Sequence, residues 1–166
     1  MTTYTVDVEN GLERWYQNGD LHREDGPAVV RPNGTKEWYH NGERHRDDGP
    51  AVEWADGGFE WYVNGECHRE DGPAVEFDDG EKWWYLNGLR HREDDPAIEY
   101  PDGGKEWYYG GLLHRLDGPA IEYPDGNGSW WINGYSLSES EYKNRTSNCH
   151  NKIFNTINIF LKKLKK

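Results

Sequence analysis

The sequence has few of the residues that usually build a protein core. Leu, Ile, Val and Phe make up only 27 of its 166 residues, a share that together with a high net charge normally indicates disorder. No run of 18 apolar residues occurs, and residues 1–10 lack the charged and apolar regions of a leader, so we expect neither a transmembrane helix nor a signal peptide. The two cysteines show no metal-binding or disulfide-framework spacing. We therefore expect reduced thiols and an intracellular, cytoplasmic protein.

Aromatic residues replace the missing aliphatic ones. The chain has nine Trp, eleven Tyr and four Phe, and each ring buries about 150–250 Å² when it is packed. The sequence therefore predicts a folded protein with an aromatic core.

An internal repeat of 23 residues runs through most of the chain, and such a fixed period indicates a repeat architecture. The repeated positions are occupied by His22, His45, His68, His91 and His114, and by Asp25, Asp48, Asp71, Asp94 and Asp117. Arg follows each His, and Pro-Ala follows each Asp after one further residue. Two turn signatures recur at the same period, for example Asp56-Gly57 and Asn64-Gly65.

Asn-Gly and Asp-Gly favour two-residue type I′ turns, so each repeat should hold two β-hairpins. In the third repeat, the Asn64-Gly65 turn then pairs Tyr62 with Cys67, Trp61 with His68 and Glu60 with Arg69. The Asp56-Gly57 turn pairs Glu53 with Glu60. Because side chains alternate along a strand, this register predicts a core face formed by Val52, Trp54, Phe59, Trp61 and His68.

The predicted fold is all-β, with tandem 23-residue β-hairpin repeats that form an elongated twisted antiparallel sheet or an open β-solenoid, followed by a short α-helical tail. Residues 1–134 form the repeat array, a half-repeat plus five repeats, and carry 29 acidic and 12 basic residues. Residues 135–166 carry two acidic and seven basic residues. Ser138-x-x-Glu141 is typical of a capping box, and apolar residues between Ile153 and Leu164 recur at helical spacing, so we expect a basic capping tail.

The run Trp61-Tyr62-Val63-Asn64-Gly65-Glu66-Cys67-His68, repeated every 23 residues, resembles a MORN-type repeat. It is more similar to a divergent variant, W-Y-x-N-G-x-x-H-R-x-D-G-P-A, found in bacteria, phages and large DNA viruses. The resemblance covers about residues 4–134. It implies a β-hairpin scaffold that binds proteins, with a role at phospholipid membranes for MORN arrays in general. The chain departs from the usual motif, because Arg-x-Asp-Gly-Pro replaces the Gly-x-Gly after the His.

The five repeated His residues suggest metal binding, but their spacing opposes a shared site. Adjacent repeats are at least two strands apart, about 9.6 Å, whereas zinc ligands lie about 2 Å from the metal. We therefore predict a structural role, in which a ring nitrogen bonds the Asp or a backbone carbonyl of its own turn. No metal or cofactor is expected.

Two predicted carboxylate pairs, Glu53 with Glu60 and Glu99 with Glu106, are typical of glycosidases. Arg69 and Arg115 are expected opposite Glu60 and Glu106, where they would balance the acidic charge. Because the pattern is duplicated and no unique cleft is indicated, we predict no catalytic residues and no enzyme activity.

The face opposite the predicted core carries a ladder of aromatic residues among these glutamates. Its members are Tyr39, Tyr62, Tyr85, Tyr108 and Trp131, together with Glu53, Glu60, Glu99 and Glu106. Two interpretations stay open: the ladder forms a protein interface, in which Tyr and Trp are favoured, or it stiffens a thin sheet. The leading hypothesis is a non-enzymatic scaffold that binds a protein with a basic patch and does not bind nucleic acid directly.

Three alternatives stay open at this point. The acidic array could mimic nucleic acid and block a basic site on a host protein, as a phage or viral inhibitor would. The rows of Trp and Glu could bind or cleave carbohydrate. The basic tail could bind an anionic lipid surface.

Overall fold

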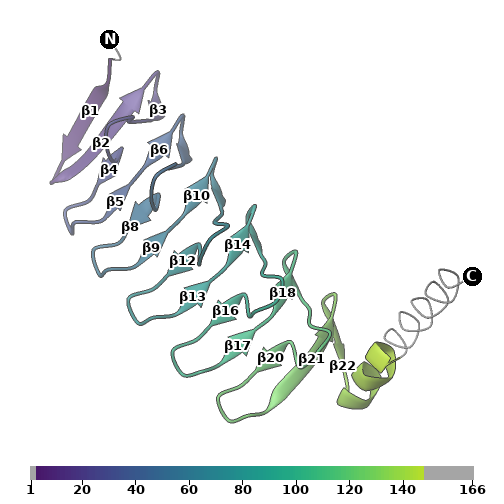
Figure 1. The fold of residues 1–166 in the computed structure, drawn as a ribbon. Helices are drawn as coiled ribbons and strands as arrows, with labels where there is room; N and C mark the ends of the chain where they lie inside the picture. The colour runs from purple at the N-terminus through teal and green to yellow at the C-terminus, as the bar shows by residue number, and fades with distance from the viewer. Residues whose placement is uncertain (1–2, 148–166) are drawn as a thin grey trace, which may run out of the picture.

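The computed structural model describes residues 3–147 and shows an elongated row of hairpins (Figure 1). The predicted all-β repeat fold is confirmed: a 14-stranded antiparallel sheet runs the length of the array and is not closed on itself. Its path is formed by β1 (Thr5–Glu9), β2 (Leu12–Gln17), β4 (Val29–Val30), β5 (Lys36–Glu37), β8 (Val52–Glu53), β9 (Phe59–Glu60), β12 (Val75–Glu76), β13 (Lys82–Trp83), β16 (Ile98–Glu99), β17 (Lys105–Glu106), β20 (Ile121–Glu122), β21 (Gly128–Ile132) and β22 (Tyr135–Leu137).

Short hairpins extend one side of this sheet. Next to β2 lies β3 (Asp20–Leu21), and the other hairpins are β6 (Tyr39–His40) with β7 (Glu43–Arg44), β10 (Tyr62–Val63) with β11 (Glu66–Cys67), β14 (Tyr85–Leu86) with β15 (Leu89–Arg90), and β18 (Tyr108–Tyr109) with β19 (Leu112–Leu113). These hairpins end at the Asn-Gly turns, or at Gly110-Gly111 in one repeat, and the Asp-Gly turns lie at the opposite edge of the array (Figure 1).

The Asn-Gly turns have the predicted geometry. Asn64 and Gly65 both adopt positive φ, at 50° and 78°, as a type I′ turn requires. Tyr62 pairs with Cys67, and the His68 N–H donates to the Trp61 carbonyl oxygen at 3.0 Å. The predicted pairing beyond that point is wrong, because the Arg69 N–H donates to the carbonyl of Tyr85 in the next repeat.

The Asp-Gly turns differ from the prediction. Gly57 has a φ of 108° and Asp56 is not in the positive region. The Trp54 N–H donates to the Gly58 carbonyl at 2.9 Å, so the loop holds three residues rather than two, a length that commonly ends in a left-handed glycine. The strand register therefore shifts by one residue, and Val52 lies opposite Glu60 instead of Trp61.

This shift moves side chains between the two faces of the sheet, because directly opposed residues share a face. The predicted core face is consequently wrong in composition. Val52 and Glu60 share one face, which we call the sheet face, and Glu53 and Phe59 share the other. Trp54 lies on the sheet face, where its indole N–H donates to Glu60.

The second face carries Trp61 and His68 and is crossed by the Arg-x-Asp-Gly-Pro segments, so we call it the loop face. In each repeat the Arg guanidinium lies over the Trp ring of its own repeat. The distances from Cζ to the ring centroid are 3.9 Å for Arg23 on Trp15, 4.0 Å for Arg46 on Trp38, 4.2 Å for Arg69 on Trp61, 4.0 Å for Arg92 on Trp84 and 3.7 Å for Arg115 on Trp107. These stacks bury the apolar rings under cations, and the following alanines are fully buried.

A helix begins at residue 139 and runs to the end of the described chain at 147. The predicted capping box is confirmed: the Glu141 N–H donates to Ser138 Oγ at 3.3 Å, and the Ser138 N–H donates to Glu141 Oε2 at 2.9 Å. Tyr142 packs on Trp130 with ring centroids 4.6 Å apart. Its hydroxyl oxygen accepts a hydrogen bond from the Gly118 N–H, so the helix covers the last repeat.

The predicted apolar helical stripe from Ile153 to Leu164, and with it the lipid-binding tail, lies outside the described residues. Within residues 3–147, no helix is long and apolar enough to cross a membrane.

Candidate functional site

The sheet face presents the predicted aromatic ladder. Its half-buried members are Tyr39, Tyr62, Tyr85, Tyr108 and Trp131, one in each successive repeat. Beside this ladder runs a second row, contributed by β5, β9, β13 and β17. It consists of Glu37, Glu60, Trp83 and Glu106, separated by Val or Ile residues of the neighbouring strands. The structure thus brings the tyrosines together with Glu60 and Glu106.

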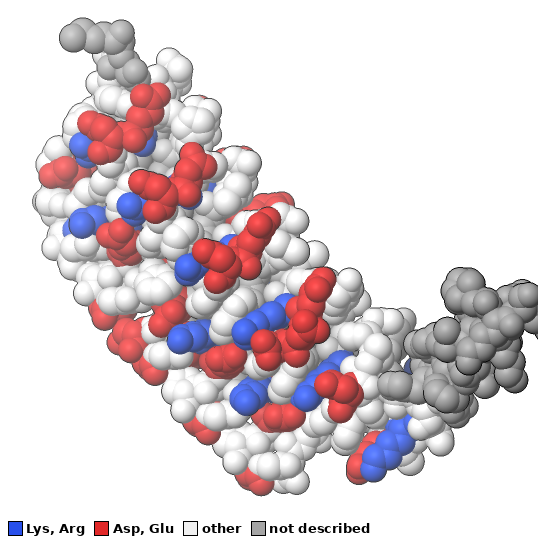
Figure 2. Space-filling view, in the orientation of Figure 1, with Lys and Arg blue, Asp and Glu red and all other residues white. Residues whose placement is uncertain are grey.

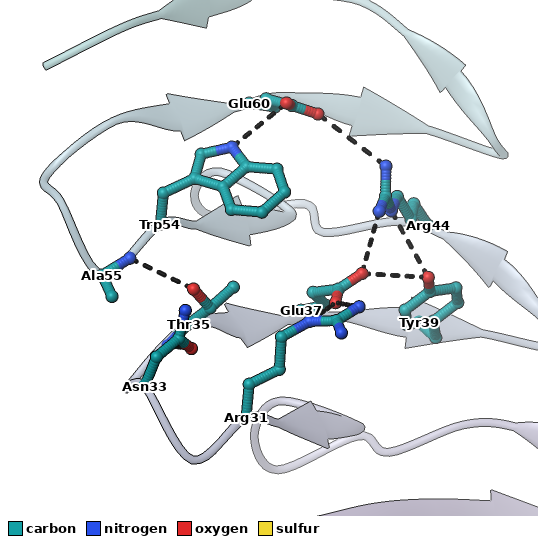
Figure 3. Close-up of polar contacts among 9 residues, drawn as sticks. All are labelled: Arg31, Asn33, Thr35, Glu37, Tyr39, Arg44, Trp54, Ala55 and Glu60. Carbon is teal, nitrogen blue, oxygen red and sulfur yellow. Dashed lines mark hydrogen bonds and ion pairs between the residues drawn. The ribbon is translucent and has the colours of Figure 1, made fainter. Parts of the chain in front are cut away.

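Glu37 is the most buried acidic residue of this face, with 1% of its surface exposed (Figure 3). Arg31 Nε donates to Oε1 at 2.8 Å and Arg44 Nη2 donates to Oε2 at 2.9 Å. The Tyr39 hydroxyl donates to the same Oε2 at 3.1 Å. Burial by itself raises the pKa of Glu37. The hydrogen bonds from the two guanidinium groups outweigh burial and hold this pKa below its ordinary value. A buried anion is therefore held between two cations.

The equivalent glutamates are also bound by donors. Glu60 accepts from Trp54 Nε1 at 3.1 Å and lies 3.8 Å from Arg44 Nη1 (Figure 3). Glu106 accepts from the hydroxyl groups of Tyr100 at 3.0 Å and Tyr108 at 2.8 Å. The carboxylates of this face thus orient the neighbouring rings.

The predicted carboxylate pairs are not formed. Glu53 and Glu99 lie on the loop face, where Arg46 and Arg92 donate to them at 2.9 and 3.0 Å, whereas Glu60 and Glu106 lie on the sheet face. The one-residue register shift separates each pair. The structure therefore contradicts the carboxylate pairing on which the glycosidase hypothesis depends.

The cations predicted for Glu60 and Glu106 are also elsewhere. Arg69 donates to Asp71 at 2.8 Å, and Arg115 donates to Asp117 and to Glu122, both at 2.7 Å.

The sequence interpretation missed a second aromatic column on the sheet face. Trp54, Phe77 and Tyr123 are 36%, 37% and 48% exposed, and Tyr100 occupies the same repeat position between the last two. A 23-residue signal was available, since each of these residues precedes an Asp-Gly loop. The predicted register places Trp54 on the core face, so this column is not recognised as exposed from the sequence.

The repeated His residues link neighbouring repeats. Nδ1 of His22, His45, His68, His91 and His114 accepts the backbone N–H at the turn of the following repeat, each at 3.1 Å. The predicted bond to the repeated Asp of the same turn is wrong for His45, whose Nε2 lies 3.1 Å from Asp47, while Asp48 accepts from Arg46. Each His thus fixes the position of the next turn.

The repeated Asp residues bind the Arg side chains that cover the Trp rings, which we call the arginine lids. Asp25, Asp48, Asp71 and Asp117 accept from the Nε of the Arg two positions earlier at 2.7–2.9 Å. These hydrogen bonds lower the pKa of Asp25, Asp48 and Asp71. In the fourth repeat, Asp95 rather than Asp94 pairs with Arg92, because Asp-Asp-Pro replaces Asp-Gly-Pro.

Cys67 lies on the sheet face opposite Tyr62. Burial and the nearby Glu60 carboxylate raise the pKa of its thiol from 9.0 to about 12. In a Cys149→Ser protein, we therefore expect iodoacetamide at pH 8 to alkylate Cys67 at least about tenfold more slowly in the folded than in the urea-unfolded chain, because the thiolate is the nucleophile. Equal rates would contradict this assignment.

The same shift has a consequence for stability. Because the pKa of Cys67 is raised in the folded chain, its contribution to the free energy of unfolding is complete below pH 9. This contribution is lost as the pH rises from 9 towards about 12. Tyr62, whose pKa is raised from 10.0 to about 12 chiefly by burial, adds to the loss in the same alkaline range.

Comparisons with known proteins add no relative. No protein-family model matches the chain, and no curated protein matches it either. Among residues 3–147, no group of three or more His, Cys, Asp or Glu side chains is placed to hold a metal ion.

Proposed function

We propose that this chain is a non-catalytic, MORN-like binding scaffold whose sheet face recognises another protein. The observation that carries the proposal is the pair of aromatic columns on one open face, of which Trp54, Phe77 and Tyr123 are the most exposed members. Exposed Trp and Tyr side chains contribute strongly to protein interfaces, since they bury much area at low entropic cost.

The internal hydrogen bonds of this face support a preorganised surface. The rings of Trp54, Tyr100 and Tyr108 are fixed by bonds to Glu60 or Glu106. A ligand therefore meets side chains that are already ordered, and this lowers the entropic cost of binding. The acidic excess of residues 1–134 would steer a partner with a basic patch towards the array.

The test is affinity capture from a host lysate with mass spectrometry, followed by titration of the purified partner. Replacing Trp54, Phe77 and Tyr123 by Ala should weaken binding by at least about tenfold, because interface hot spots contribute about 2 kcal/mol or more. The matched control replaces Leu89, Leu112 and Tyr135, which are also exposed but lie directly after the Asn-Gly and Gly-Gly turns. Partner binding that survives the triple variant unchanged would refute the proposal.

The acidic-mimic function is the second candidate. Its support is the repeated rows of Asp and Glu that cross the loop face (Figure 2). An inhibitor of this kind would bind a basic nucleic-acid site, and its affinity would fall steeply with salt. An aromatic interface on the sheet face would show a shallower salt dependence.

A further inference from the structure

The loop face contains clefts between successive Arg-x-Asp-Gly-Pro segments. One cleft of about 720 Å³ lies between residues 23–26 and 45–48, with Trp38 and His40 in its lining. A second, of about 700 Å³, is lined by residues 69–73 and 91–93, with Trp84 and Leu86. A third, of about 300 Å³, is lined by residues 92–94 and 114–117, with Trp107 and Tyr109. The loop face therefore carries clefts between the first and second, the third and fourth, and the fourth and fifth of these segments.

Each cleft is rimmed by carboxylates that the structure leaves without a permanent cation. The repeat Arg is already matched by its Asp, as in Arg23 with Asp25 at 2.8 Å. The side chain of the residue between them lies near the repeat His: Glu24 lies 3.9 Å from His22, Asp47 lies 3.1 Å from His45 and Glu70 lies 4.0 Å from His68. The equivalent Glu93 is exposed. One negative charge in each of four repeats is therefore available to a ligand.

The last segment breaks this pattern. Leu116 stands where the other segments have an acidic residue, and it is half exposed, as is Tyr109 in the same cleft. The row thus has four acidic positions followed by an apolar one. Because the row is asymmetric, a peptide that lies along it would bind in a single N-to-C orientation.

The spacing of the clefts selects the shape of the ligand. Adjacent repeats are two strand spacings apart, about 9.6 Å. A polyproline II segment rises about 3.1 Å per residue with three residues per turn, or about 9.3 Å per turn. Every third side chain would therefore meet successive repeats, with an accumulated mismatch of only about 1 Å over four repeats.

We propose that the loop face binds an extended polyproline II segment that carries Arg at every third residue and an apolar residue at the Leu116 end. Each guanidinium would lie between the carboxylates of adjacent segments, which its planar fork binds better than the ammonium of Lys does. The Trp rings of the clefts already lie under the Arg of their own repeats, so the ligand would contact the rims of the clefts. The site is separate from the sheet face and extends the proposed scaffold function to a second ligand.

A fluorescent synthetic peptide tests the proposal by anisotropy with the full chain at physiological salt. The probe has four Arg residues, each separated by two Pro, and ends in Leu. Its control has the same composition with the four Arg residues contiguous. We expect the periodic peptide to bind at least about tenfold more tightly, since only its charges match the repeat spacing.

The variant Glu24→Gln, Asp47→Asn, Glu70→Gln should weaken the periodic peptide by at least about tenfold, because each exposed ion pair contributes up to about fivefold. The matched control replaces Asp20, Glu43 and Glu66 by their amides. These carboxylates are exposed in the same repeats, but they follow the Asn-Gly turns.

Three results would overturn the proposal: no binding, equal binding of the periodic and contiguous peptides, or equal losses in the two triple variants. The last two would show non-specific attraction by net charge. The Trp54, Phe77 and Tyr123 variant should bind the peptide normally, so failure of this site and failure of the sheet-face function give different results.

Discussion

Replacing Tyr142 by Ala is expected to lower the free energy of unfolding of the last repeat by about 3 kcal/mol, the lower end of the range for a buried aromatic residue. Tyr142 is only 4% exposed, packs on Trp130 and accepts the Gly118 N–H. Its ring lies on Trp130 as the arginine lids lie on the earlier tryptophans. Loss of the ring would leave Trp130 and the Gly118 N–H uncovered.

The expected loss is local, because repeats are stabilised by their immediate neighbours. Hydrogen exchange should accelerate in β20, β21 and β22 and stay unchanged in β4 and β5. Tyr142→Phe is the matched control: it keeps the ring and removes one hydrogen-bond acceptor, for a cost of about 1 kcal/mol. Unchanged exchange in β21 of the Ala variant would show that the helix does not stabilise the array.

Replacing Glu37 by Gln is expected to lower the free energy of unfolding by about 2 kcal/mol, measured by urea denaturation. Removing one partner from a fully buried ion pair costs about 3–5 kcal/mol. The cost is smaller here, because the side chains of Arg31 and Arg44 are 46% and 29% exposed and water can solvate them. Glu53→Gln, which removes an exposed carboxylate from the loop face, should cost less than about 1 kcal/mol.

The pH dependence gives an independent check on Glu37. Its pKa is lowered in the folded chain, so its contribution is present above the reference value of 4.5 and is lost as the pH falls through the folded-state pKa. The stability difference between wild type and Glu37→Gln should shrink below pH 4.5. A difference that stays constant down to pH 2 would mean that the charge of Glu37 is not the stabilising feature.

The repeat architecture, the geometry of the Asn-Gly turns and the start of the helix could be predicted from the residues. The Asn-Gly pairs specify their turn, since both residues must adopt positive φ, and the pairing of Tyr62 with Cys67 follows directly. The capping box at Ser138 and Glu141 was equally readable, because it depends on residues three positions apart.

The candidate site was predicted only in part. The tyrosine ladder and Glu60 lie together on one face, but Glu53 and Glu99 lie on the other, and the column that includes Trp54 was missed. All three differences have one cause: the Asp-Gly loops, among them Asp56-Gly57 and Asp102-Gly103, have three residues rather than two. Asp-Gly is compatible with both lengths, and a change of one residue reverses the face of every side chain in the adjoining strand.

Local sequence signals establish that this protein is a β-hairpin array of 23-residue period, because turn residues and strand alternation act over a few positions. The packing of the folded repeats establishes which side chains share a face and which partner each polar group binds. His22 bonds the turn of the next repeat, Arg44 bonds Glu37, and Tyr142 covers Trp130. These contacts depend on the packing of neighbouring repeats and of the helix against the last one, and spacing along the chain does not specify that packing.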